Sequence, residues 1–135
     1  MVTVERSCQM SKNEGVVRLL VVDDEPMVRA TIRMILTLEG YAVETSDNAE
    51  DALSLFEKSR FDVVITDYSL PAMSGDRLAK AIRERVPNQP IIMITAYADH
   101  LREGGKRVAA VDYLLSKPFE LPVLRALVVQ ALNRQ

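Results

Sequence analysis

The chain has 135 residues, of which 48% are hydrophobic and 27% are charged, and its formal net charge is −2. This length suits one domain with its own core, and the lack of a basic stripe gives no indication of binding to nucleic acid or to an anionic membrane. No apolar stretch approaches the length of a membrane span, and the single cysteine, Cys8, excludes an internal disulfide and favours a reducing cytoplasm.

Residues 1–16 show no sustained hydrophobic periodicity and no apolar block of the kind found in signal peptides. We expect them to form a flexible leader and residues 17–135 to form a single domain. In that domain short apolar runs alternate with helical patterns, which is typical of βαβ units and a parallel sheet. The predicted strands are Arg18–Val22, Ala42–Ser46, Asp62–Thr66, Ile91–Ile94 and Asp112–Leu115.

Helical patterns fill the intervals between these strands. The first helix is predicted to begin at Pro26 and to end at Gly40, because proline suits a first helical turn and glycine commonly follows a helix. Asp47, with Glu50 three residues later, resembles a capping box at the start of the second helix. The third helix follows a loop that contains Gly75.

The fourth predicted helix, around residues 101–108, is weak. Gly104 and Gly105 occupy positions on its inward stripe, where each glycine costs about 1 kcal/mol relative to alanine. We expect this segment to be easily remodelled. A fifth helix over Leu121–Leu132 completes an α/β fold with five strands and five helices.

Polar residues stand at the carboxyl ends of four predicted strands, namely Asp23 with Asp24, Asp67, Thr95 and Lys117. In an open parallel sheet these ends lie side by side at the edge where ligands bind. Any one of these residues alone is more often a helix cap or a solvated loop residue. Three carboxylates together repel one another unless a cation is bound, so the cluster favours a functional interpretation.

The cluster suits phosphoryl transfer with a hard divalent ion. Carboxylate oxygens are ligands for Mg²⁺, and no His or Cys stands nearby to suggest zinc. The ion and a lysine neutralise charge on the phosphoryl oxygens while a carboxylate attacks phosphorus in line. No Gly-rich Walker loop is present for ATP.

Four motifs resemble those of the response regulator receiver domain, the phosphorylatable module of bacterial two-component signalling. The resemblance covers residues 18 to about 133, and the motifs are Val22–Pro26, Thr66–Gly75, Ile94–Tyr97 and Ser116–Phe119. It implies a flavodoxin-like, doubly wound (βα)5 fold, with strand order 2-1-3-4-5 and helices on both faces of the sheet.

The resemblance also implies a role for each acid. Asp67 is the expected phosphoacceptor. Asp24 is expected to bind Mg²⁺ directly and Asp23 through water, with the Ser69 backbone carbonyl and Asp67 completing the protein's ligands. Mn²⁺ is the alternative ion.

Further residues are expected to bind or tune the phosphoryl group. Thr95, the Ala96 backbone and Lys117 would contact phosphoryl oxygens. Ser69 and Tyr97, each two places beyond a site residue, would tune dephosphorylation. The bond between Lys117 and Pro118 is expected to be cis, as in the family.

One position departs from the family pattern. The aromatic switch residue usually stands three places before the lysine, where this chain has Leu114. Tyr113 lies one place earlier, so strand alternation would direct it to the opposite face. The usual coupling between Thr95 and an aromatic ring is therefore open to question, and Leu114 and Tyr113 both remain candidate switch residues.

The resemblance implies partners rather than a substrate that is turned over. The phosphodonor would be a phosphohistidine on a sensor histidine kinase or a phosphotransfer protein. The target would bind the face formed by the fourth helix, fifth strand and fifth helix, and phosphorylation-dependent homodimerisation is an alternative. We expect a cytoplasmic protein that binds neither nucleic acid nor membrane. Its only chemistry would be its own phosphorylation and dephosphorylation.

Other interpretations are weighed against this one. A hydrolase of the haloacid-dehalogenase type also uses Asp, Mg²⁺ and Lys, but it carries a second acid where this chain has Ser69. A flavodoxin-like cofactor binder would need phosphate donors in its first loop, which here is acidic. A receiver-like interaction module that does not use phosphate is the remaining alternative.

Overall fold

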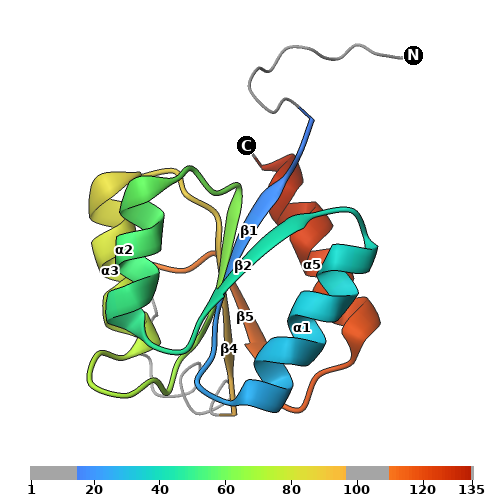
Figure 1. Ribbon diagram of the computed structural model, residues 1–135, viewed down its shortest axis with the longest axis horizontal. Coiled ribbons are helices and arrows are strands. Elements are labelled where there is room, and N and C mark those ends of the chain that lie inside the picture. The colour runs from blue at the N-terminus through green and yellow to red at the C-terminus, as the bar shows by residue number, and fades with distance from the viewer. Residues whose placement is uncertain (1–14, 97–109, 135) are drawn as a thin grey trace.

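The computed structural model describes residues 15–96 and 110–134, and it shows a central parallel sheet between two layers of helices (Figure 1). Five strands lie in the order β2-β1-β3-β4-β5, which confirms the predicted fold class. The strands are β1 (Arg18–Val22), β2 (Ala42–Ser46), β3 (Val63–Asp67), β4 (Ile91–Thr95) and β5 (Tyr113–Ser116).

Helices cover both faces of the sheet. The helices in the described residues are α1 (Pro26–Leu38), α2 (Ala49–Lys58), α3 (Gly75–Arg85) and α5 (Leu121–Asn133). In Figure 1, α1 and α5 lie on one side of the strands and α2 and α3 on the other. The expected weak helix around residues 101–108 lies outside the described residues, as do residues 1–14 of the expected leader.

The alternation of side chains along β1 divides the core in two. Leu19 and Val21 pack with the inward residues of α1 and α5, whereas Leu20 and Val22 pack with those of α2 and α3. All four are buried. The central strands are therefore apolar on both faces, as expected of a sheet covered by two helical layers.

Most element boundaries agree with the sequence patterns. Gly40 has φ +96, a left-handed conformation that suits glycine, directly after the C-cap of α1. The start of α2 differs, because Asn48 is the N-cap and its side chain accepts the backbone N–H of Asp51 at 2.7 Å. The predicted capping box of Asp47 and Glu50 was therefore wrong by one position.

The third strand also lies one residue later than predicted. It runs to Asp67, whose Cα pairs with Ile94 of β4. Asp67 and Thr95 are thus the last residues of their strands, whereas Asp23 and Lys117 directly follow theirs. Among the helices described, none is both long and apolar enough to cross a membrane.

Candidate phosphoryl and metal site

Three carboxylates meet at the carboxyl edge of the sheet. Asp23 directly follows β1, Asp67 ends β3, and Asp24 begins the turn into α1. Carboxylate oxygens of the three residues all lie within 4.8 Å of one another. Asp23 and Asp67 are buried, at 1% and 5% exposure, whereas Asp24 is exposed to solvent. This set of hard oxygen donors with one open side fits a partly hydrated Mg²⁺ ion.

Asp23 is held at each of its polar groups. Its backbone N–H donates to the Ser46 carbonyl at 3.1 Å, and its carbonyl accepts from Arg29 at 2.8 Å. One carboxylate oxygen accepts the Glu25 backbone N–H at 2.9 Å. The other lies 3.4 Å from the Nζ atom of Lys117. The carboxylate therefore has a fixed orientation at the mouth of the site.

Asp67 is fixed by the sheet and by the loop that follows it. The N–H of Tyr68 donates to the Ile94 carbonyl at 3.0 Å, which extends the β3–β4 ladder past Asp67. The loop then returns, and the N–H of Gly75 donates to the Tyr68 carbonyl at 2.9 Å. The backbone N–H of Ser69 bonds to the Asp67 carboxylate. These contacts aim the Asp67 carboxylate at the other two acids.

Lys117 supplies the positive charge of the site. Its Nζ atom lies 3.4 Å from carboxylate oxygens of Asp23, Asp67 and Glu25. The Lys117 backbone N–H donates to the Thr95 carbonyl at 2.8 Å, so the ends of β4 and β5 are joined at the site. The bond from Lys117 to Pro118 is cis, as the resemblance implied.

The ionisation of the cluster reflects its burial. Burial, and then the charge of Asp23, raise the pKa of Asp67, and neither Lys117 nor the Ser69 N–H fully offsets them. Burial likewise raises the pKa of Asp23 against the Glu25 N–H and Lys117. Burial alone would lower the pKa of Lys117, but the surrounding carboxylates outweigh it and raise that pKa. A bound divalent cation would favour the ionised form of both buried acids.

The remaining predicted residues are placed in part. Thr95 is buried at the end of β4, and Ala96 is exposed directly after it, both beside the acids at the sheet edge. Ser69 is exposed in the loop after Asp67. Tyr97 lies outside the described residues.

The structure separates the two candidate switch residues. Tyr113 packs against the core layer formed with α1 and α5, together with Leu115. The guanidinium of Arg134 lies over the Tyr113 ring, 5.6 Å from its centroid. Leu114 lies between Tyr113 and Leu115 on β5, and strand alternation directs its side chain to the other face of the sheet. Tyr113 therefore lies on the side of the sheet that α1 and α5 cover.

Two residues near the acids were missed by the sequence analysis. Glu25 reaches Lys117, and Arg29 reaches the backbone of Asp23. Their positions in the chain were a partial signal, although the contacts themselves depend on tertiary packing. Both residues stand within six places of Asp23 in the turn and first turns of α1, where the helix start places their side chains near the sheet edge.

The comparisons with known proteins agree with this geometry. The model of the family described as "Response regulator receiver domain" matches residues 19–129. The chain belongs to this family. Receiver domains serve two-component signalling, so the fold and the convergence of the acids with Lys117 are those of a signalling module.

Similar proteins and structures support the assignment. The receiver domain is 36% identical to "Regulatory protein AtoC" of Escherichia coli K12, over 87% of this chain and 26% of that protein. It is 37% identical to "Response regulator MprA" of Mycolicibacterium vanbaalenii, over 87% of this chain and 51% of that protein. The chain thus spans about half or less of the length of these curated relatives.

Solved structures cover the same region. The structure of response regulator TrrA from Thermotoga maritima, in complex with Mg²⁺ and BeF, matches with a TM-score of 0.79 and 36% identity, covering 86% of this chain and 99% of that one. The chemotaxis response regulator CheY4 of Vibrio cholerae matches with a TM-score of 0.79 and 30% identity, covering 86% of this chain and 98% of that one.

Proposed function

We propose that the receiver domain accepts a phosphoryl group on Asp67 from a phosphohistidine of a sensor histidine kinase or a phosphotransfer protein. The observation that carries the proposal is the convergence of three carboxylates with the Lys117 ammonium at one sheet edge. Membership of the receiver family and the Mg²⁺ and BeF complex of the TrrA relative support it.

The transfer follows from the placement of the side chains. An ionised oxygen of Asp67 attacks phosphorus, an O–P bond forms, and the P–N bond to the donor imidazole breaks. The electron pair of that bond remains on the ring nitrogen, and the imidazole leaves as the neutral base because its other nitrogen takes a proton from solvent before or as the bond breaks. Lys117 and the Thr95 hydroxyl are proposed to bind two phosphoryl oxygens. The backbone N–H of Ala96 is proposed to donate a third hydrogen bond to the phosphoryl group.

Asp23, Asp24 and Asp67, with the Ser69 carbonyl, are the residues that would hold Mg²⁺, or Mn²⁺ in its place. When bound, the ion supplies positive charge that offsets the charge of the phosphoryl oxygens. The backbone N–H of Glu25 donates to the Asp23 carboxylate and keeps it oriented for this role. Ser69 and Tyr97 are proposed to set the rate at which water removes the phosphoryl group.

The output is proposed to be a change of protein surface. The downstream target would bind β5, α5 and the predicted fourth helix, which lies outside the described residues, with homodimerisation as the alternative, and the site of action would be the cytoplasm. The domain would turn over no separate substrate. Its only chemistry would be the gain and loss of its own phosphoryl group.

Labelling with acetyl phosphate tests the proposal. With Mg²⁺ present, intact-mass spectrometry is expected to show one added phosphoryl group that hydroxylamine removes. Asp67→Asn is expected to abolish it. The control is Asp47→Asn, because Asp47 is an exposed acid at the same sheet edge that lies outside the cluster. Labelling that survives Asp67→Asn would overturn the assignment, and no labelling of the native chain would favour a phosphate-independent interaction module.

A further inference from the structure

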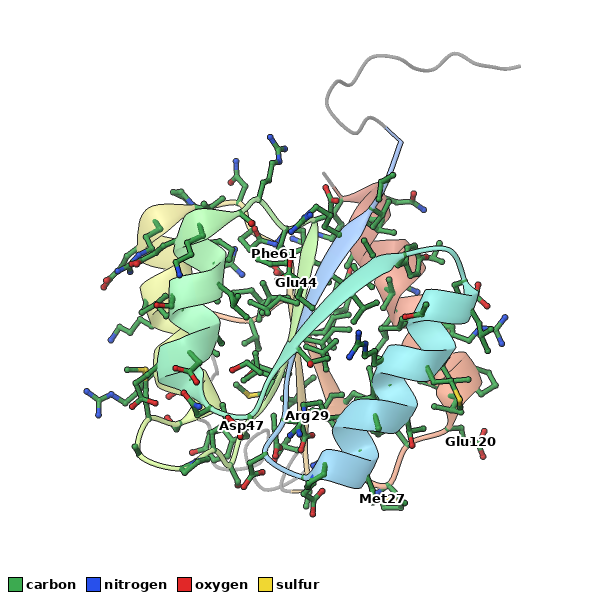
Figure 2. The ribbon with its side chains drawn as sticks, in the orientation of Figure 1. Met27, Arg29, Glu44, Asp47, Phe61 and Glu120 are labelled. Atoms are coloured by element: carbon green, nitrogen blue, oxygen red, sulfur yellow. The ribbon has the colours of Figure 1, made fainter. Side chains whose placement is uncertain are left out.

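Arg29 lies on the first turns of α1 with its guanidinium directed back to β1. In Figure 2, Arg29 lies at the lower edge of the sheet, near the turn that joins β1 to α1. Its Nη1 atom donates to the carbonyl oxygen of Asp23 at 2.8 Å, and the side chain is half-buried. That carbonyl belongs to the peptide that links Asp23 to Asp24, the two acids proposed to hold the ion.

The guanidinium serves this one contact among the described residues. Within residues 15–96 and 110–134, the Arg29 side chain forms neither a salt bridge nor a second hydrogen bond. A planar cation with five donors commonly pairs with a carboxylate when one is available. Here Asp23 carries a carboxylate of its own, yet the arginine binds the main-chain carbonyl of that residue instead. The geometry points to a role in holding the backbone rather than in pairing charge.

We propose that Arg29 is a positioning residue for the metal site. Its hydrogen bond fixes the peptide plane between Asp23 and Asp24, and the Ser46 carbonyl fixes the N–H on the other side of Asp23. The directions in which the two carboxylates leave the backbone are set by that plane. This inference rests on the proposed Mg²⁺ site, and it assigns part of the ion affinity to a residue that does not touch the ion.

Charge and positioning predict opposite outcomes when Arg29 is replaced. A guanidinium close to a cation site repels the ion, so its removal would strengthen Mg²⁺ binding if charge alone mattered. Loss of a hydrogen bond that orients the metal ligands weakens binding, commonly by about 10- to 100-fold. The sign of the change in affinity therefore separates the two roles.

The experiment is a calorimetric titration of the full chain with Mg²⁺. Arg29→Met, which removes both donor and charge, is expected to raise the dissociation constant about tenfold or more. Arg33→Met is the matched control, since Arg33 is exposed on the same helix and its side chain forms no hydrogen bond or ion pair with the described residues. We expect that variant to bind Mg²⁺ as the native chain does.

A second measurement excludes a merely structural effect. At saturating Mg²⁺, the affinity of Arg29→Met for beryllofluoride is expected to return close to the native value, because the ligand geometry is recovered once the ion is bound. Equal or tighter Mg²⁺ binding by Arg29→Met would overturn the inference, as would beryllofluoride binding that stays weak at saturation. If this variant does not fold by circular dichroism, Arg29→Gln, whose amide is too short to reach the carbonyl, takes its place with the same criteria. Failure of the native chain to bind Mg²⁺ would instead refute the proposed function.

Discussion

Gly75 packs its Cα against the carbonyl group of Asp67. A Cβ atom added at Gly75 would collide with the Asp67 carbonyl oxygen and lie 2.9 Å from the carbonyl carbon. The backbone of the proposed phosphoacceptor is thus in direct contact with the first residue of α3. No side chain other than hydrogen fits at this position without moving one of the two segments.

Gly75→Ala is therefore expected to destabilise the fold and to disturb the site. Overpacking against backbone costs roughly 1–3 kcal/mol, which a urea denaturation curve would measure. Because either α3 or Asp67 must move to relieve the clash of the added methyl group, we also expect weaker Mg²⁺ binding. Gly40→Ala is the control, since Gly40 has φ +96 with open space around its Cα. It should lose stability through backbone strain but keep Mg²⁺ affinity. Native-like Mg²⁺ binding by Gly75→Ala would show that the contact does not position Asp67.

Asp67→Asn is expected to stabilise the metal-free protein. Burial and the charge of Asp23 raise the pKa of Asp67, which means that its ionised form is unfavourable in the folded state. An amide of the same shape removes that charge while Lys117 keeps Asp23 and Glu25 as partners. We expect a higher free energy of unfolding at pH 7 in urea denaturation without divalent ions. A less stable variant would mean that the attraction between Lys117 and the Asp67 carboxylate exceeds the repulsion between Asp67 and Asp23.

The raised pKa of Asp67 also makes the stability of the fold depend on pH in a definite direction. An acid whose native pKa is raised binds more protons when folded, so its contribution to stability falls as the pH rises from about 4 through the native pKa. The advantage of Asp67→Asn should thus be largest at neutral pH and should shrink as the pH falls. Mg²⁺ should raise the native melting temperature more at pH 7.5 than at pH 5, where protons compete for the aspartates. A Mg²⁺ effect that grows on acidification would contradict the raised pKa values.

Lys117→Met is expected to destabilise the metal-free protein. The substitution leaves Asp23 and Asp67 buried without their only cation within salt-bridge distance among the described residues, at a cost of roughly 1–3 kcal/mol. Since the Lys117 pKa is raised, the native contribution is complete below the unfolded value of about 10.4 and is lost as the pH rises through the native pKa. In acid the difference in stability between native and variant proteins should narrow for a separate reason, because protonation of Asp23 and Asp67 removes the charges that Lys117 attracts. Lys80→Met, at an exposed position on α3, is the control.

The sequence was sufficient to predict the sheet and the acids because both depend on local patterns. Continuous apolar runs such as that of β3 specify buried strands, and parallel topology brings their carboxyl ends to one edge. The position of the α2 cap was not predictable in this way. Asp47 and Asn48 are both good caps, and only the extended backbone at Asn48, which places its side chain over the Asp51 N–H, selects between them.

The contacts of Arg29 and Lys117 could not be derived from the sequence pattern either. Arg29 reads as an ordinary polar residue of an amphipathic helix, and its bond to the Asp23 carbonyl depends on the path of the β1–α1 turn. Similarly, Lys117 reaches Glu25 only because the two loops approach across the sheet edge, 92 residues apart in the chain. Such long-range contacts are set by tertiary packing rather than by periodicity.

The last prediction concerns how a phosphoryl group at Asp67 would alter β5. Tyr113 lies in the core layer beneath α1 and α5 and beside Arg134, away from the face that Leu114 occupies. The direct link from the site to β5 is instead the bond from the Lys117 N–H to the Thr95 carbonyl at 2.8 Å. A ligand shifts a conformation only through contacts that differ between two states, and here those are the contacts of Thr95 and Lys117 with the phosphoryl group.

We therefore expect beryllofluoride with Mg²⁺ to change hydrogen exchange in residues 96–110 and in β5. Thr95→Ala should abolish that change, whereas Tyr113→Leu, which keeps an apolar side chain in the core, should retain it. Loss of the exchange response in a Tyr113→Leu variant that still binds beryllofluoride would identify the tyrosine as the switch, and protection confined to the loops at Asp24 and Asp67 would exclude this route altogether.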